Sequence, residues 1–503
     1  MGSVDSNLRI PLGITVFVGF LLGMLAMFFV AGVFGFSAPI AWPVVVVLFL
    51  FVVFFLERPK TYLFVMFLFF GLYYNFRMLN GPRVIPIYLP FEQMLDELFM
   101  IVPIGVIILR VTQHRQPPGA TWFPLLYVVL VLISRQYNQV PLMPFLQASL
   151  SYFKFYILWY FVRCIGPWTV KDFKWILGLI AGFAFLQFAL NVSLWQRSFV
   201  VHINPDFSTG TVGNAHFCGY ICAIALLLMG GWMLTQKTWF TWSVIFVAGI
   251  SLAAAYNLIF LTDTKHALIL IPFVVAPLLF YRRIPVRNRV LLVIVGLLFV
   301  LAVYAYFVVA KVFQVYHDIS FTWDQIRWGG KGAVFRAITT DFVRHIGFWL
   351  FGMGPGNFCS SNALYAMRPL AMKYVLPYTP WAYGGFQSAS ATMVGTPSCG
   401  YFTLFGEFGP ALAIGYIAIW LHFILHLWRL AQARVDDLFV CVLRISTACS
   451  LIFFLALNLV YELFNIQILV LPLMTLTGAL WDVSSLTAHH VRNKPSVGDH
   501  SLE

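Results

Sequence analysis

Two arginines in the second half of the chain have the spacing of a phosphate-binding pair. Arg336, Thr340 and Arg344 follow one another at intervals of four, which on a helix places them along one face. A guanidinium presents planar N–H donors that match a phosphate group in a two-point contact. The spacing predicts a site for an anionic lipid or a lipid-linked diphosphate. The alternative is that these arginines contact lipid headgroups at the membrane interface.

Three further ionisable residues stand at the edges of apolar runs. Lys265 opens one run within Thr262–His266, Glu407 lies in the first turns of another, and Glu462 lies between the last two. Ionisable groups at such depth are functional candidates, and a carboxylate in an apolar pocket suits general acid–base chemistry. The alternatives are a snorkelling lysine and a salt bridge to a neighbouring base; we favour the salt bridge for Glu462.

Between these positions lies the segment Phe351–Asn357, in which three glycines alternate with other residues. Such a segment allows close backbone approach, and its amides can form a concave anion-binding nest; alone it is more often a turn. Cys359 and Cys399 flank the segment that follows, and a disulfide between them is a hypothesis. The histidines show no metal-ligand spacing, so the sequence predicts no metal and no cofactor.

The composition identifies the kind of protein that must position these residues. Of the 503 residues, 61% are hydrophobic, 18% aromatic and only 10% charged. A soluble domain carries about 25% charged residues, so this chain cannot cover a water-facing surface. A soluble enzyme, a coiled coil and a disordered chain are excluded. Nucleic acid is also excluded as a partner, because the net charge of +13 is accounted for by membrane orientation.

The fold class predicted is an all-α polytopic membrane protein with about fourteen transmembrane helices. The predicted spans are Gly13–Phe34, Pro39–Leu56, Thr61–Tyr74, Phe91–Leu109, Thr121–Ser134, Leu146–Ile165, Trp175–Trp195, Ala215–Leu234, Phe240–Leu261, Lys265–Tyr281, Val290–Ala310, Gly400–Leu427, Leu438–Tyr461 and Phe464–Trp481.

The basic residues orient these spans. With the N-terminus inside, the inner loops hold 17 Lys and Arg residues and the short outer loops only 4. This bias predicts a multi-pass protein with both termini in the cytoplasm. Spans 1 to 11 occupy 1–310, a large outer loop 311–399, spans 12 to 14 400–481, and a cytoplasmic tail 482–503.

The large outer loop is predicted to contain an amphipathic helix over Ala333–Leu350. Its apolar side chains recur at helical spacing, so they should form one buried or membrane-facing stripe. That stripe consists of Phe335, Ile338, Phe342, Ile346 and Trp349. Loops of this length within a compact fold are usually functional.

The order of these features resembles the O-antigen ligase and O-antigen polymerase superfamily. The resemblance rests on four stretches: Gly210–His216, Thr262–Ala267, Arg336–Phe358 and Tyr401–Gly409. They are similar to the family's Gly-and-Asn stretch before a helix, its basic residue opening a span, its arginine-led periplasmic segment with glycines, and its aromatic and Glu-x-Gly loop exit.

The resemblance implies a metal-independent glycosyltransferase of the GT-C-like type at the periplasmic face of the bacterial inner membrane. Its donor and acceptor would be undecaprenyl-diphosphate-linked oligosaccharides, with membrane lipids, a chain-length regulator and a flippase as partners. Lys265, Arg336 and Arg344 would bind the diphosphate, and His345 or Glu407 would act as base.

One departure bears on the choice of reaction. The ligases have a histidine before the loop exit, where this sequence has Ser398. This favours polymerisation of repeat units into an O-antigen or exopolysaccharide over ligation of a glycan to a lipid or protein. A transporter of lipid or polysaccharide is the alternative from another class, favoured by Lys154 and Arg444 within spans.

Overall fold

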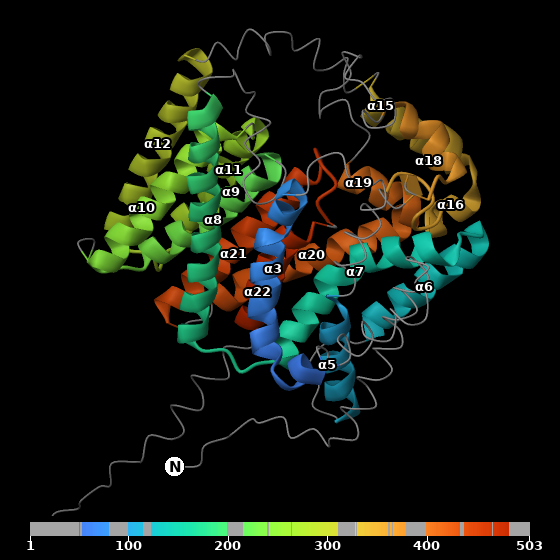
Figure 1. Cartoon of the computed structure of the whole chain (residues 1–503), viewed down its shortest axis with the longest axis horizontal. Helices are drawn as coiled ribbons and strands as arrows, with labels where there is room; N and C mark the ends of the chain where they lie inside the picture. The colour runs from blue at the N-terminus through green and yellow to red at the C-terminus, as the bar shows by residue number, and fades with distance from the viewer. Residues whose placement is uncertain are drawn as a thin grey trace, which may run out of the picture.

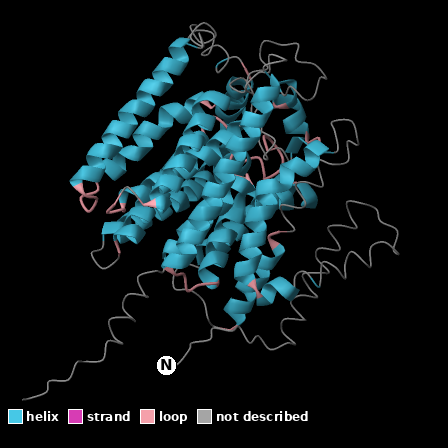
Figure 2. Ribbon diagram, turned by 60° about the vertical axis from the view of Figure 1, so that its left-hand side comes forward, coloured by secondary structure: helices cyan, strands magenta, loops and turns pink. Residues whose placement is uncertain are grey.

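The computed structural model describes residues 50, 53–79, 99–113, 122–198, 215–238, 241–262, 264–309, 327, 329–360, 363–364, 366–378, 399–432, 437–464 and 466–481. Every regular element in these ranges is helical (Figure 2). The all-α prediction is confirmed for this part of the chain.

Long helices make up most of the described chain (Figure 1). They are α3 (Pro59–Leu79), α5 (Ile101–Thr112), α6 (Trp122–Asn138), α7 (Leu142–Cys164), α8 (Val170–Ser198), α9 (Ala215–Leu234), α10 (Trp242–Tyr256), α11 (Lys265–Phe280), α12 (Val286–Val309), α20 (Gly409–Gln432), α21 (Leu438–Leu457) and α22 (Gln467–Trp481). Short helical elements lie between α12 and α20: α15 (Gly330–Arg336), η3 (Ala337–Asp341), η4 (Phe342–Arg344), α16 (Ile346–Phe351), α18 (Pro369–Tyr374), η5 (Leu376–Tyr378), α19 (Gly400–Thr403) and η7 (Leu404–Phe408).

Each of the twelve predicted spans from Thr61 onward corresponds to one of these helices. The first two predicted spans lie wholly or mostly outside the described residues. Within the described ranges, six helical stretches are long and apolar enough to cross a membrane, among them His216–Leu234 and Leu438–Leu457. The chain is therefore a helical membrane protein.

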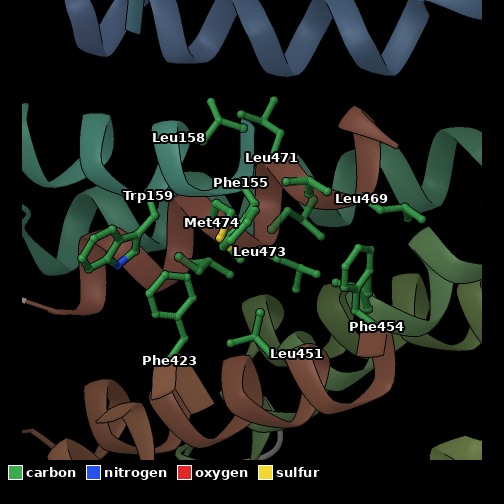
Figure 3. Packing of buried hydrophobic residues seen from close by; sticks show 14 of the residues in the cluster. Phe155, Leu158, Trp159, Phe423, Leu451, Phe454, Leu469, Leu471, Leu473 and Met474 are labelled. Atoms are coloured by element: carbon green, nitrogen blue, oxygen red, sulfur yellow. The ribbon is translucent and has the colours of Figure 1, made fainter. Parts of the chain in front are cut away.

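The core lies where α7, α20, α21 and α22 meet. Phe155 of α7 stacks on Trp420 of α20, and Trp420 stacks in turn on Phe454 of α21, at centroid distances of 4.7 and 5.1 Å. Leu473 and Met474 of α22 are fully buried among them (Figure 3). Large aromatic rings fill the space between these four helices, and α5, α9 and α11 pack directly against them.

Other helices present apolar surface to their surroundings. Only 6% of the most apolar 18-residue stretch of α12 is buried within the protein. Leu297, Leu301 and Tyr304 are each more than 60% exposed. In Figure 1, α12 stands at one flank of the bundle, where it packs against α11. A continuous apolar face of this length requires a lipid environment.

The loops that the charge pattern assigns to the inner side of the membrane contact one another in pairs. Lys60 Nζ, at the start of α3, donates to the carbonyl of Pro167 before α8. Tyr281, after α11, donates to the carbonyl of Ala431 at the end of α20. The large loop lies at the other end of the bundle, where Ser134 of α6 donates to the carbonyl of Phe351.

Candidate functional site

Three π-helical turns occur in the described residues, and each lies beside a candidate residue. The turn η2 (Asn257–Leu261) leads into Lys265, η3 begins directly after Arg336, and η7 contains Glu407. A π-turn widens the helix by one residue and leaves part of its backbone ladder unmade, and such turns occur mainly at functional sites. The periodicity of the sequence gave no sign of them.

The side chain of Glu407 is hydrogen-bonded to the glycine-rich segment. Its side chain is fully buried, and its two carboxylate oxygens accept four backbone N–H groups. Oε2 accepts from Gly356 at 2.6 Å, and Oε1 accepts from the amides of Phe358, Cys359 and Ser360 at 2.8 to 3.1 Å. The predicted amide nest therefore exists, but the anion in it is the chain's own carboxylate. This geometry favours a structural role for Glu407 over an acid–base role.

The glycines of this segment are required by its conformation. Gly352, Gly354 and Gly356 have φ values of +60°, +90° and +74°. A Cβ on Gly352 would lie 2.4 Å from the carbonyl oxygen of Glu407. The amides of Met353 and Gly354 donate to the carbonyls of Gly406 and Glu407, each at 2.9 Å. We call residues 352–360 together with the turn η7 the glycine clasp.

The predicted amphipathic helix over Ala333–Leu350 is not continuous. It consists of α15, η3 and η4, ends at His345, where the backbone becomes extended, and resumes as α16. The predicted stripe is accordingly wrong in part. Ile338 and Phe342 are buried, but Ile346 is 89% exposed and Phe348 takes its place inside. A break in the helix changes the directions of all side chains after it relative to those before it. Regular spacing in the sequence cannot reveal such a break.

The two arginines of the predicted pair have different surroundings. Arg336 is half-buried and donates to the carbonyl of Arg327. Arg344 is exposed and contributes to lowering the pKa of Asp341, after the hydrogen bonds that Asp341 accepts from Tyr374 and Thr340. His345, beside Arg344, is also exposed, and its backbone contacts Phe342 and Phe348 within the loop.

Lys265 is the first residue of α11; its side chain lies outside the described part of the structure. Next to it, His266 belongs to a group of rings that sequence reasoning missed. The hydroxyl of Tyr220 is hydrogen-bonded to Nε2 of His266. The ring of His216 lies 5.8 Å from that of His266, and Tyr461 lies 5.0 Å from His216 and 5.4 Å from His266. We call these four residues the histidine–tyrosine cluster.

The cluster joins helices that are distant in sequence. His216 and Tyr220 lie in the first turns of α9, His266 in the first turn of α11, and Tyr461 follows α21. A Cβ on Gly219 would lie 2.4 Å from Thr264, so α9 and the start of α11 touch at this point. The N-terminal ends of α9 and α11 are thus adjacent, and both favour negative charge.

The segment after α21 connects the cluster to the large loop. The amide of Gly400, which begins α19, donates to the carbonyl of Tyr461 at 3.0 Å, and Cys399 Sγ donates to Asn458 O at 3.3 Å. Since η7 follows α19 directly and is part of the glycine clasp, these contacts link His216, His266 and Tyr461 to Glu407 and the glycine-rich segment.

Glu462 and Lys331 lie within this region as buried ionisable side chains. Tyr152 of α7 donates to Glu462 Oε1 at 2.8 Å, and burial raises the pKa of Glu462 to about 8. The salt bridge predicted for Glu462 is not found among the described residues; Lys154 acts on it only as a nearby charge. Lys331 of α15 is 7% exposed, and burial lowers its pKa to about 8.

The remaining expectations from the sequence concern a disulfide, a buried arginine and Ser398. Cys359 and Cys399 are both buried and are not joined by a disulfide, so the hypothesised bridge is absent. Arg444 is fully buried and donates to the carbonyls of Leu430 and Leu480, the last turns of α20 and α22. It therefore ties two helix ends together. Ser398, at the position of the ligase histidine, lies outside the described residues.

An apolar groove of about 600 Å³ runs between α8 and α10. It is lined by Phe185 and Phe188 of α8 and by Phe246, Gly249 and Tyr256 of α10, among others. Tyr256 directly precedes η2, which leads to Lys265, so one lining residue of the groove is close in sequence to the start of α11. Its walls and shape suit a hydrocarbon chain.

Comparison of the chain with protein-family models, with curated proteins and with solved structures gives no match.

Proposed function

We propose that this protein polymerises undecaprenyl-diphosphate-linked oligosaccharide repeat units into a cell-surface polysaccharide at the periplasmic face of the bacterial inner membrane. The observation that carries the proposal is that segments distant in sequence come together in the structure. Four stretches that resemble the O-antigen polymerase superfamily extend over about 200 residues of sequence, yet contacts through His216, His266, Tyr461 and Glu407 link described residues of each.

The chemistry of this region supports a diphosphate ligand. The helix ends of α9 and α11 meet there, and Lys265 stands at one of them. In the proposal, Lys265, Arg336 and Arg344 neutralise the negative charge that develops on the lipid diphosphate as the glycosidic bond breaks. The glycine clasp holds the arginine-bearing loop in place, with Glu407 as its internal anchor.

The groove between α8 and α10 supports a lipid-linked substrate. A polyprenyl chain lying along Phe185, Phe246 and Tyr256 would bring its diphosphate toward η2 and Lys265. Burial of apolar surface stabilises such a chain by about 25 cal/mol per Å². The proposal includes the finer topology from the sequence: about fourteen spans, both termini cytoplasmic and the large loop in the periplasm.

Two features that favoured transport receive other roles in the structure. Arg444 is hydrogen-bonded to helix-end carbonyls, and Lys154 lies close to the buried Glu462. Neither needs a transported substrate to explain it. Ligation of a finished glycan uses the same region and chemistry, and differs in the acceptor.

The experiment that tests the proposal is deletion of the gene in its host, with sizing of lipid-linked oligosaccharides and surface polysaccharide. Complementation uses Lys265→Ala, Arg336→Ala and the control Lys174→Ala, an exposed lysine of α8 at the opposite end. We expect single repeat units to accumulate, with rescue by wild type and Lys174→Ala only. Long lipid-linked chains that fail to reach an acceptor would indicate the ligase instead, and an unchanged glycan profile would contradict both.

A further inference from the structure

The histidine–tyrosine cluster contains groups that can accept or release protons. It also lies next to helix ends that would favour a bound anion. His216, Tyr220, His266 and Tyr461 come from three separate parts of the chain, and their ring centroids lie 5.0 to 6.0 Å apart. Packing two imidazoles and two phenols together at the junction of three elements is costly unless they form hydrogen bonds. Its member His266 directly follows Lys265 in sequence, and the cluster lies at the N-terminal ends of α9 and α11.

Within the cluster, His266 and Tyr220 have unequal exposure. Tyr220 is fully buried in α9, whereas His266 is only partly buried at the start of α11. The Tyr220 hydroxyl contacts Nε2 of His266, which fixes the orientation of the imidazole ring. A histidine held at one nitrogen by a buried partner and partly exposed elsewhere is the arrangement found in general bases.

We propose that His266 is the general base of the glycosyl transfer, with Tyr220 as the residue that positions it. This inference rests on the proposed function and deepens it by assigning the proton acceptor. In the part of the chain that the structure describes, His216 and Tyr220 of α9 and Tyr461 after α21 lie against the ring of His266, and Lys265 is its chain neighbour.

The transfer step balances as follows. The hydroxyl oxygen of the acceptor sugar forms a bond to the anomeric carbon of the donor, while the bond from that carbon to the diphosphate oxygen breaks. Nε2–H of His266 donates to the Tyr220 hydroxyl oxygen, and the hydroxyl proton of the acceptor passes to Nδ1 of the imidazole. The bonding electron pair leaves with the lipid diphosphate, whose charge the neighbouring cations stabilise, and the imidazolium then releases its proton to water.

The test uses the full-length protein in lipid nanodiscs with lipid-linked repeat units from the host. The variants are His266→Gln, Tyr220→Phe and the control His422→Gln, an exposed histidine of α20 outside the cluster. We expect His266→Gln to lower the maximal rate by about 100-fold or more, the usual contribution of a general base. Binding of undecaprenyl diphosphate and the melting temperature should stay unchanged.

The pH profile separates a base from a packing residue. The wild-type rate should rise with pH as the imidazole of the base loses its proton, and this rise should disappear in His266→Gln. Tyr220→Phe should show an intermediate rate and keep a shifted profile, and His422→Gln should match wild type.

Three outcomes would overturn the inference. The first is a wild-type rate and pH profile in His266→Gln. The second is a parallel loss of melting temperature and undecaprenyl diphosphate binding, which would make the cluster a packing element. The third is loss of the pH-dependent rate in His345→Gln alone, which would return the base to the large loop. If wild-type protein forms no polymer at all, the proposed function itself fails.

Discussion

At the scale of single residues, Glu407 is defined by the four amides around it. A glutamine at this position keeps one acceptor oxygen but turns an NH2 group toward the amide of Gly356, so two donors face each other. We expect Glu407→Gln to destabilise the protein by about 1.5–3 kcal/mol, the range for a hydrogen bond to a charged group. The melting temperature in detergent and the rate of proteolysis within the large loop measure this loss.

Glu462→Gln is the matched control for this prediction. Burial raises the pKa of Glu462 to about 8, so at pH 7 its carboxyl is mostly protonated and a neutral amide resembles it. The amide oxygen can still accept the hydrogen bond from Tyr152. We expect little change in melting temperature at pH 7. Equal effects of the two substitutions would contradict the structural role of Glu407.

Lys331 makes stability depend on pH in a direction that its burial determines. Its pKa falls from 10.5 to about 8 in the folded protein. Between these values the unfolded chain binds more protons than the folded one, so this residue's contribution makes stability rise as pH increases from 8 to 10.5. Below pH 8 the buried charge costs on the order of 3 kcal/mol. Lys331→Met should therefore melt higher than wild type at pH 7.

The advantage of Lys331→Met should shrink as pH approaches 10, and melting curves at pH 7 and 9.5 check this. Lys373→Met in α18 serves as control, because Lys373 is exposed and its hydrogen-bonding to Tyr374 raises rather than lowers its pKa. An advantage of Lys331→Met that stays constant with pH would mean that the lysine is not the titrating group.

At the scale of helices, the groove between α8 and α10 allows a substitution that fills it without disturbing packing. Nothing lies within 4 Å of a Cβ added to Gly249, which lines the groove, or to Gly296 of α12, which faces outward. Gly249→Phe should raise the donor concentration for half-maximal polymer formation by about tenfold. This change equals about 1.4 kcal/mol of lost apolar burial. Gly296→Phe should behave as wild type.

The readout for this pair is the donor concentration that gives half-maximal polymer formation, with melting temperatures as the check on folding. Both variants should melt like wild type. If Gly249→Phe and Gly296→Phe raised the half-maximal concentration equally, the effect would come from bulk on the lipid-facing surface, and the groove would have no specific occupant.

Helices were predictable from the sequence to the extent that apolar length determines them. The run that became α9 was predicted with its observed bounds, because a membrane span needs about 20 apolar residues whatever surrounds it. The π-turns and the break at His345 depend on contacts between distant residues. Glu407, for example, is 51 residues from Gly356, and no local pattern encodes that pairing.

The same distinction applies to the candidate site. Lys265 and Arg336 were identifiable as charges at the edges of apolar runs. His266 was visible beside Lys265, but its importance came from Tyr220, 46 positions earlier, and from Tyr461. Chemistry carried by single charges could be found in the sequence, whereas chemistry that depends on rings meeting across helices required the fold.

At the scale of the whole molecule, the two ends of the bundle should face different compartments. Lys373 is exposed on the large loop and Lys174 is exposed near the start of α8, close to the end where Lys60 meets Pro167. All seven cysteines are buried, so the wild-type protein offers little background for thiol labelling. The orientation that we propose from the basic residues would place Lys373 in the periplasm and Lys174 in the cytoplasm.

A membrane-impermeant maleimide applied to spheroplasts can distinguish these sides. Lys373→Cys should react in intact spheroplasts, and Lys174→Cys only after the membrane is permeabilised. Denaturing the protein first should make the buried cysteines react as well, which shows that folding protects them. Labelling of Lys174→Cys alone in intact spheroplasts would invert the topology. The large loop would then face the cytoplasm, where a periplasmic lipid-linked donor could not reach the histidine–tyrosine cluster, and the proposed reaction would be excluded on that ground alone.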